Sequence, residues 1–214
     1  KEKGISRVGT STNASLLTYE RGKKIIDAGL DAKNISLDAA TKETYRKVRH
    51  NLPYDVVMKN VEDICKYKKS KGVKKPELTV DIVAINENKS EVNQFIKRWK
   101  PYVDHVNVTT LHSWVGQFTE ESIDQVHTSR LNVEKPPCRF LWTDMMIYWD
   151  GTVPICCLDY DATSPIGDCS KDSISKICQS DKFNEIRKMH LSRAYDEIAI
   201  CKICGYHSVW WLFK

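Results

Sequence analysis

Residues 55–86, DVVMKNVEDICKYKKSKGVKKPELTVDIVAIN, join a helical pattern to a strand pattern and decide the fold class. Residues 55–72 carry apolar side chains at helical spacing and end at Gly72, a residue typical of helix C-caps. Residues 77–86 are rich in β-branched residues and read as a strand. A helix followed closely by such a strand predicts an α/β protein.

The same alternation continues on both sides of this stretch. Strands are expected at residues 7–13, 33–39 and 104–111, and helices at 17–30 and 89–100, the last with Ser90 as its N-cap and Pro101 at its end. This order predicts parallel strands joined by right-handed crossovers. Four such units make half of a barrel. Because residues 1–4 resemble the tail of a helix, we expect an N-terminal segment to precede them.

Composition narrows the class of protein. A hydrophobic content of 41% and a charged content of 29% are typical of soluble proteins. The sequence has neither an apolar run long enough to span a membrane nor a secretory signal, which favours a cytoplasmic location. The net charge is +5, but residues 138–214 hold 9 Lys and Arg against 10 Asp and Glu. This balance argues against a nucleic-acid-binding zinc module.

The chain is expected to divide into a first domain at 1–110, a connector at 111–137 and a second domain at 138–214. In the second domain, residues 141–157 predict a β-hairpin around Asp150-Gly151, a favoured turn dipeptide. Residues 172–197 predict one helix, with Asp172 or Ser173 as its N-cap.

Seven of the eight cysteines lie after residue 137, and in a chain without an export signal they indicate metal binding rather than disulfides. Cys201 and Cys204 have the spacing of two ligands to one centre. Two further thiolates would come from Cys138 and from one member of the Cys156-Cys157 pair, since neighbours in a strand face opposite ways. Zinc and an iron–sulfur cluster both fit this spacing. Structural or surface roles are expected for Cys65, Cys169, Cys178, His190 and His207.

These residues resemble the radical S-adenosylmethionine (radical SAM) enzymes that carry a SPASM or twitch auxiliary-cluster domain. STNASLLT, with Thr12-Asn13, looks like the third barrel strand, and ISLDAATKETYRKVR looks like the fourth strand with the helix after it. The more specific match lies in the second domain, in an array with these members: Trp114, Gly116, Cys138, Leu141, Trp142, Ile147, Trp149, Asp150, Gly151, Val153, Cys156, Cys157, Asp159, Ile166, Gly167, Asp168, Ile186, Arg187, His190, Cys201 and Cys204.

The resemblance implies an α/β fold made of the C-terminal half of a partial (β/α)6 TIM-like barrel, followed by a small α+β SPASM/twitch domain with a β-hairpin. It selects Cys156 as the ligand, through the family spacing Gly151-x4-Cys156, and leaves Cys157 facing the core. Cys138, Cys156, Cys201 and Cys204 then match the arrangement that holds one auxiliary [4Fe–4S] cluster.

The family motif C-x3-C-x2-C, which binds the cluster that cleaves S-adenosyl-L-methionine, is missing. Only Cys65 precedes Cys138, so the motif is expected upstream of Lys1 and this chain alone is expected to be inactive. The full-length protein would hold S-adenosyl-L-methionine and a second [4Fe–4S] cluster. Alanine also replaces the commoner glycine in the Thr-Asn-Gly and Ser-Leu-Asp-Gly signatures.

The resemblance also implies contacts and partners. Thr12, Asn13, Ser36, Asp38 and Arg49 are the expected S-adenosylmethionine-binding residues, with Arg49 able to pair with the carboxylate of the cofactor. Arg139, Trp142, Tyr148 and Asp159 are weaker candidates for substrate contacts. The expected partners are the missing N-terminal half-barrel segment, a reductant such as flavodoxin or ferredoxin, and a sugar, cyclitol or peptide substrate that is oxidised or otherwise modified. Nucleic acid and membrane are not expected. The alternatives are a non-catalytic four-cysteine zinc module or a degenerate family member.

Overall fold

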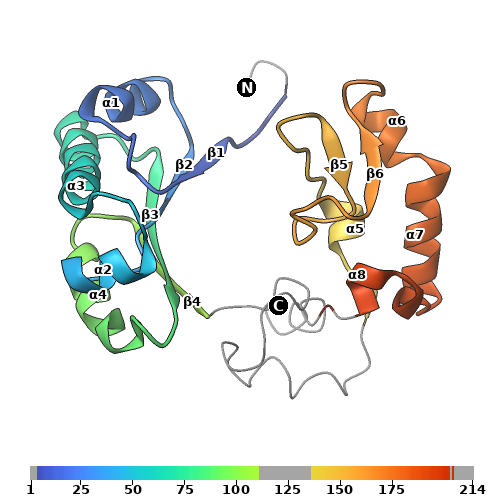
Figure 1. The fold of residues 1–214 in the computed structure, drawn as a ribbon. Helices are drawn as coiled ribbons and strands as arrows, with labels where there is room; N and C mark the ends of the chain where they lie inside the picture. The colour runs from blue at the N-terminus through green and yellow to red at the C-terminus, as the bar shows by residue number, and fades with distance from the viewer. Residues whose placement is uncertain (1–3, 111–135, 203, 205–214) are drawn as a thin grey trace. The chain divides into compact units, whose positions relative to one another are not determined.

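The computed structural model describes residues 4–110, 136–202 and 204, and it divides into two compact units, Lys1–Leu111 and His112–Lys214 (Figure 1). The expected connector at 111–137 lies outside the described residues except for Pro136 and Pro137.

The N-terminal unit is built on four parallel strands, as the sequence predicts. They are β1 (Gly9–Thr12), β2 (Ala32–Ser36), β3 (Glu77–Ala84) and β4 (His105–Thr110), and they pair in the order β1-β2-β3-β4. Every neighbouring pair is parallel, so each connection must cross over the sheet. This α/β unit has the strand arrangement of part of a barrel.

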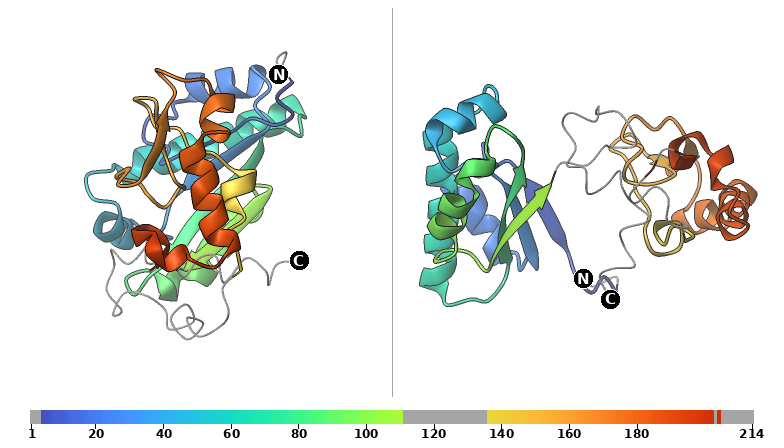
Figure 2. Two further views of the ribbon diagram at one scale, coloured as in Figure 1. Left: turned by 90° about the vertical axis from the view of Figure 1, so that its right-hand side faces the viewer. Right: turned by 90° about the horizontal axis from the view of Figure 1, so that it is seen from below.

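The helices of this unit are α1 (Tyr19–Asp27), α2 (Lys42–Val48), α3 (Tyr54–Lys71) and α4 (Val92–Trp99), with a 3-10 turn, η1, at Lys89–Glu91. Figures 1 and 2 show them gathered on one face of the sheet. Leu78, Val80 and Ile82 alternate along β3 and are fully buried in the apolar core of this unit. Gly72 caps α3 in the left-handed conformation with φ 63°, which confirms the predicted end of the helix.

The opposite face of the sheet is polar. In the register of the strands, Ser36, Asp81 and Asn107 form one row across β2, β3 and β4. The side chains of this row alternate with the buried positions, and Asn107 donates a hydrogen bond to Asp81 Oδ1 at 2.8 Å. The interior of a fully packed barrel is filled by apolar side chains. The polar face of this sheet therefore agrees better with an open barrel that has room for a ligand.

The start of the helix predicted at 89–100 differs from the expectation. Ser90 does not cap it; α4 begins at Val92 after the turn η1, and its N-cap residue is Glu91, without a side-chain cap hydrogen bond. Asn88 is buried and organises this turn, with its Oδ1 accepting from the Ile85 backbone N–H. The short polar Asn88 side chain therefore competes successfully with Ser90 for the local backbone groups.

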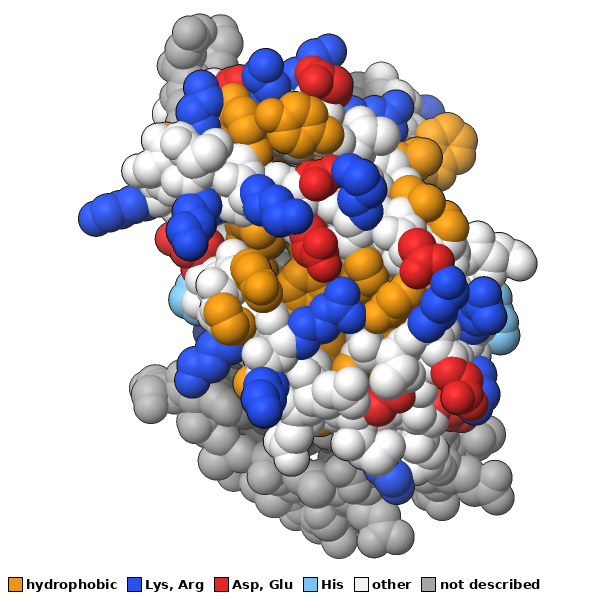
Figure 3. All heavy atoms as spheres, turned by 90° about the vertical axis from the view of Figure 1, so that its left-hand side faces the viewer, with side chains coloured by type: hydrophobic (Ala, Val, Ile, Leu, Met, Phe, Trp, Pro, Cys, Tyr) orange, Lys and Arg blue, Asp and Glu red, His pale blue; other side chains and the backbone are white. Residues whose placement is uncertain are grey.

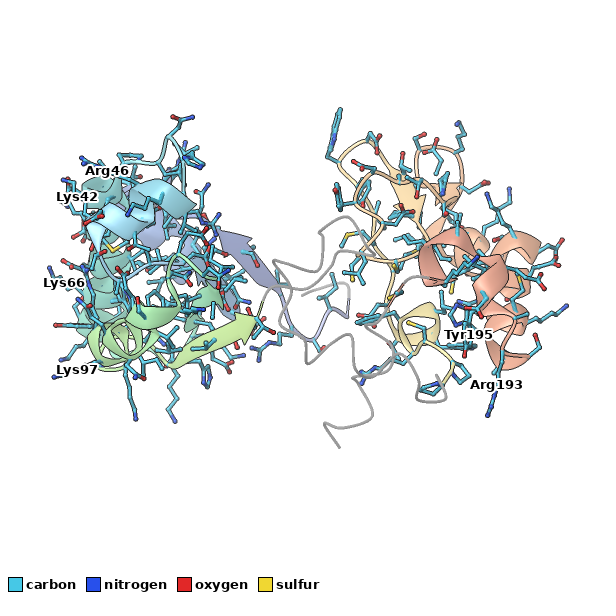
Figure 4. All side chains as sticks on the ribbon, turned by 60° about the horizontal axis from the view of Figure 1, so that its bottom comes forward. Lys42, Arg46, Lys66, Lys97, Arg193 and Tyr195 are labelled. Atoms are coloured by element: carbon cyan, nitrogen blue, oxygen red, sulfur yellow. The ribbon has the colours of Figure 1, made fainter. Side chains whose placement is uncertain are left out.

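The outer surface of these helices mixes charges of both signs. Figure 3 shows Lys and Arg interspersed with Asp and Glu on this side, and Figure 4 shows Lys42, Arg46, Lys66 and Lys97 projecting outward. Lys42 pairs with Asp55, and Lys66 lies 3.9 Å from Glu62. Such exposed pairs add little stability, so the core carries the fold.

The C-terminal unit consists of short elements. They are α5 (Phe140–Thr143), β5 (Thr152–Pro154), β6 (Pro165–Asp168), α6 (Ile174–Cys178), α7 (Asp181–Leu191), a 3-10 turn η3 (Tyr195–Glu197) and α8 (Ala199–Lys202). Strands β5 and β6 pair antiparallel. A small apolar core joins them to the helices, with Leu141, Val153 and Phe183 among its buried members.

The predicted hairpin is wrong in its first strand. The turn forms, because Gly151 adopts φ 93° and Tyr148 N–H donates to the Thr152 carbonyl at 2.8 Å. However, residues 145–149 form no strand, and β5 pairs with β6 instead. Met146, Ile147 and Trp149 are exposed, so this segment buries too little apolar surface to hold a ladder.

The single helix predicted at 172–197 is divided. Ser173 caps α6, as predicted, but a second N-cap at Ser180 accepts from the Phe183 N–H and starts α7. A side chain that satisfies the free N–H groups of a new helix makes the break favourable. Within the part of the chain that the structure covers, no helix has the length and apolar character needed to cross a membrane.

Candidate metal centre

Four cysteines from three segments of the C-terminal unit line one pocket. These pocket cysteines are Cys138, Cys156, Cys201 and Cys204. The other residues that line the pocket are Phe140, Leu141, Ile155, Leu158, His190 and Ile200. Apart from His190, this wall is apolar.

Local structure places each sulfur. Cys138 immediately precedes the turn that starts α5, and its carbonyl accepts from Leu141 N–H. Cys156 follows β5 on the far side of the Gly151 turn. Cys201 lies in α8, and the Cys204 N–H donates to the Cys201 carbonyl at 3.2 Å, so a tight turn brings the last pair together.

Burial strongly affects two of these thiols. It raises the pKa of Cys138 to about 11 and the pKa of Cys156 to about 12. Backbone N–H groups oppose this effect, those of Phe140 and Leu141 at Cys138 and those of Leu158 and Asp159 at Cys156. Since only thiolates bind metals, loading this site must release protons, and the N–H groups that face the sulfurs stabilise the thiolates that result.

His190 lies against two of the pocket cysteines. It is fully buried, its Nδ1 is 3.3 Å from the Cys138 backbone nitrogen, and its Nε2 is 3.4 Å from Cys201 Sγ. The sequence predicts a structural or surface role for His190 rather than that of a ligand, and its burial agrees with the structural one. Its spacing from Phe183, two helical turns along α7, is the signal that places it on the buried face.

Cys157 points away from the core, which contradicts the orientation expected from the resemblance. It is exposed, whereas Cys156 is half-buried and packs against the apolar core. Cys157 lines a separate pocket with Phe140, Asp144, Met145, Met146 and Cys156. Both cysteines lie in the turn after β5 and not in a strand, so strand alternation does not explain the difference. Of the two, only Cys156 lines the four-cysteine pocket.

The remaining cysteines lie elsewhere. Cys65 is buried in the core of the N-terminal unit, where burial raises its pKa to about 12, and this confirms its predicted core role. Cys178 Sγ lies 3.4 Å from an Arg187 nitrogen, and Cys169 packs against the small core. Among the described residues, no group of three or more His, Cys, Asp or Glu side chains is arranged tightly around the position of a single metal ion.

The donor set of the pocket fits an iron–sulfur cluster. The four pocket cysteines supply sulfur donors only, which suit such clusters as well as zinc. The apolar wall would exclude water from the pocket, a condition that helps to set the potential of a cluster.

The expected cofactor-binding residues lie at the carboxyl end of the parallel sheet. Thr12 is the last residue of β1 and Ser36 the last of β2. Asn13 Oδ1 accepts hydrogen bonds from both the N–H and the hydroxyl of Ser15, so its side chain shapes the local turn. This edge is where parallel α/β sheets hold their ligands.

Asp38 and Arg49 bind each other at the same edge. Their ion pair joins a buried carboxylate to a guanidinium that is 29% exposed, and the other Asp38 oxygen accepts from the Val83 N–H. Asp38 also adopts φ 59°. Arg49 thus already has an internal partner, while its Nε is buried with no hydrogen-bond partner among the described residues. The contact of Arg49 with a cofactor stays a prediction.

The weaker candidates for substrate contacts have local roles. Asp159 is buried and accepts from Thr163 and Ser164, which closes the loop after β5. The Tyr148 hydroxyl donates to the Asp159 carbonyl. Trp142 is 46% exposed, and Arg139 starts the turn of α5.

Comparison with family models identifies the C-terminal unit. Residues 138–205 match SPASM, described as an iron–sulfur cluster-binding domain. The match begins at Cys138 and includes the other three pocket cysteines. The recognition of a SPASM domain is therefore confirmed.

Two curated relatives match about half of the chain. An uncharacterized protein from Treponema pallidum (strain Nichols) is 28% identical over 96 residues, which are 45% of this chain and 26% of that protein. A tungsten-containing aldehyde ferredoxin oxidoreductase cofactor-modifying protein from Pyrococcus furiosus is 29% identical over 98 residues, which are 45% of this chain and 27% of that protein. The matched segment spans about a quarter of either relative.

Solved structures share the fold over nearly the whole chain. A hexahistidine-tagged anSMEcpe with bound AdoMet has a TM-score of 0.56 at 14% identity, over 94% of this chain and 63% of that one. Native anSMEcpe with bound AdoMet and Kp18Cys peptide has a TM-score of 0.57 at 15% identity, over 94% of this chain and 66% of that one. The α/β fold with a parallel sheet is thus shared with these AdoMet-bound proteins, as expected.

Proposed function

We propose that this chain, whose residues 138–205 form an iron–sulfur cluster-binding domain of the SPASM family, is the C-terminal portion of a radical SAM enzyme. We further propose that the four pocket cysteines hold one auxiliary [4Fe–4S] cluster. The observation that carries the proposal is that four sulfurs from segments far apart in the sequence line a single, mostly apolar pocket.

The residues around the pocket have defined tasks in this proposal. The pocket cysteines bind the irons as thiolates, and the backbone N–H groups after Cys138 and Cys156 stabilise the bound sulfurs. Leu141, Ile155 and Ile200 keep water from the centre. When bound, such a cluster transfers single electrons, which suits the oxidation of a substrate. Because four protein ligands would occupy all of its irons, we propose that the cluster either transfers electrons or stabilises the domain, and does not bind substrate directly.

The N-terminal unit would supply part of the site for S-adenosylmethionine. Ser36, Asp38 and Arg49 lie at the edge of the sheet where such a cofactor would bind, which supports their proposed role. Because this sequence has no C-x3-C-x2-C motif, we propose that the chain alone does not cleave S-adenosylmethionine and works with an N-terminal half-barrel segment. Detection of 5′-deoxyadenosine from the isolated chain would contradict this.

The proposed reaction is the oxidation or modification of a sugar, cyclitol or peptide substrate, with electrons from flavodoxin or ferredoxin. The polar row of Ser36, Asp81 and Asn107 supports a substrate rich in hydrogen-bonding groups. Burial raises the pKa of Asp81, whose carboxylate has no cationic partner among the described residues. A ligand with hydroxyl or amino groups would satisfy it.

The neighbouring cysteines provide a matched test. The full chain is purified anaerobically and reconstituted with iron and sulfide, beside the variants Cys156→Ala and Cys157→Ala. We expect about four irons and four sulfides per wild-type chain, with a brown colour. Cys157→Ala should retain them, because this sulfur is exposed and lies outside the four-cysteine pocket. Cys156→Ala should lose most of the iron.

Metal analysis separates the proposal from its alternative. A colourless wild-type chain that holds zinc would overturn the cluster assignment and favour a zinc module. Equal loss of iron in both variants would contradict the selection of Cys156 as the ligand.

A further inference from the structure

The buried imidazole of His190 bridges two of the pocket cysteines. Its Nδ1 faces the backbone N–H of Cys138 at 3.3 Å, and its Nε2 faces Cys201 Sγ at 3.4 Å. The residue has no exposed surface. It is therefore a polar group inside an otherwise apolar wall, in contact with residues on both sides of the pocket.

The Cys138 contact determines which ring nitrogen carries the proton. The backbone N–H of Cys138 can only donate, so Nδ1 must present its lone pair and cannot bear a hydrogen. In a neutral imidazole the hydrogen then resides on Nε2, which faces Cys201 Sγ. Nε2 is thus the donor to this sulfur.

Packing holds the ring in this orientation. The Tyr195 ring, labelled in Figure 4, lies 5.7 Å from the His190 ring. Arg187, one turn earlier on α7, donates from Nε to the Leu141 carbonyl at 2.8 Å and from Nη1 to the Cys178 carbonyl at 2.7 Å. These bonds fix α7 against the segment that follows Cys138, so the imidazole stays near both cysteines.

We propose that His190 is a positioning residue that donates an Nε2–H···S hydrogen bond to the Cys201 thiolate and thereby raises the reduction potential of the auxiliary cluster. This inference rests on the proposed function. A hydrogen bond to a ligating sulfur withdraws negative charge, and it stabilises the reduced cluster, which carries one more electron, more than the oxidised one. A higher potential makes the cluster a better electron acceptor.

The hydrogen bond from His190 can be changed by substitution. Cys138 and Cys156 accept from backbone N–H groups, which side-chain substitution leaves in place. The His190 donor to Cys201 Sγ belongs to a side chain, and it can be removed or restored. His190→Asn keeps an acceptor for Cys138 but is too short to reach Cys201. His190→Gln carries an acceptor and a donor at the end of a longer side chain.

The experiment measures the midpoint potential of the reconstituted cluster in the full chain, by a redox titration followed by electron paramagnetic resonance. We expect reduction in His190→Asn and in His190→Leu to become at least tenfold less favourable, a downward shift of about 59 mV for one electron. His190→Gln should return to within a factor of three of the wild type. Resonance Raman should show altered Fe–S(Cys) stretching in the Asn variant.

The control is Ile186→Val, which shortens a half-buried side chain on the same helix that packs against the small core but does not line the cysteine pocket. Its potential should equal that of the wild type. If the wild type holds iron but His190→Asn keeps the wild-type potential, the inference is overturned while the proposed function stands. If the wild type holds no iron–sulfur cluster, the proposed function itself fails. If His190→Leu loses its iron, the midpoint potentials of the His190→Asn and His190→Gln variants test the inference.

Discussion

The two units of the chain differ in what holds them together. The N-terminal unit has a four-stranded sheet and an apolar core of 19 buried residues, whereas the core of the C-terminal unit has 8, counted over the described residues. The pocket cysteines pack against that smaller core. Over the residues that the structure describes, the C-terminal unit contains one two-stranded ladder, which is marginal without further support.

The difference indicates that the two units depend on different interactions. Burial of apolar surface is sufficient for a unit with a large core. Small domains with few buried apolar residues commonly need a metal centre or other cross-link to fold. In zinc-finger peptides the free energy of metal binding, about 10–16 kcal/mol, contributes directly to folding. Metal bound in the four-cysteine pocket would stabilise the C-terminal unit in the same way.

The largest expected effect is that of iron removal. Treatment of the reconstituted chain with a chelator and a mild oxidant should abolish the folded C-terminal unit and leave the N-terminal unit intact. Hydrogen exchange should show lost amide protection over α7 and unchanged protection over α3 and β3. If the amide protection of α7 survives iron removal, the small core is sufficient to fold the C-terminal unit. The proposed difference between the two units would then be wrong.

Large-to-small substitutions in the two cores should have separate consequences. Trp99 and Phe183 are both almost fully buried, and each change to alanine should cost about 3–5 kcal/mol. Trp99→Ala should lower the thermal transition of the N-terminal unit without changing the iron content. Phe183→Ala should reduce the iron content as well as stability. Thermal unfolding followed by circular dichroism, together with iron analysis, checks both, and iron loss in Trp99→Ala would contradict the independence of the units.

The N-terminal fold was predictable because its signals are local and repeated. The β-branched run of β3 and the Gly72 cap of α3 each determine their own element, and parallel pairing follows from the alternation. In the C-terminal unit the elements are too short for periodicity. The partner of β5 lies eleven residues beyond it, across a loop that the buried Asp159 organises, and no local pattern reveals this pairing.

The candidate metal centre likewise has features that the sequence predicted and features that it did not. The convergence of the four pocket cysteines agrees with their spacing and with the resemblance. The contact of His190 with Cys201 and the outward orientation of Cys157 depend on how α7 and the segment after β5 pack, which spacing does not encode. The Ser90 cap was wrong for a related reason: Ser90 has the right residue type, but the turn η1 forms there and α4 begins after it.

Glu91 provides the smallest expected effect and a test confined to the N-terminal unit. Its carboxylate accepts from the backbone N–H groups of Ala40 and Thr41 and from the hydroxyls of Thr41 and Thr44, so it ties the start of α2 to the start of α4. The N-cap of α2 itself is Thr41. Burial acts to raise the pKa of Glu91, but these hydrogen bonds outweigh it and hold the pKa below the usual 4.5. Because the amide of Gln weakens these charge-assisted hydrogen bonds, Glu91→Gln should cost about 1–2 kcal/mol at neutral pH.

The pH dependence gives this prediction its sign. A carboxylate with a lowered pKa in the folded state contributes stability above its unfolded value of 4.5, and this stability is lost as the pH falls through the folded pKa. The penalty of Glu91→Gln should therefore shrink below pH 4.5 in urea unfolding of the N-terminal unit. Glu87→Gln, an exposed residue of the same connection, is the control and should match the wild type. If the loss of stability in Glu91→Gln stays constant down to acid pH, the side chain of Glu91 stabilises the unit by packing. Its negative charge would then add nothing to the stability that the apolar core provides.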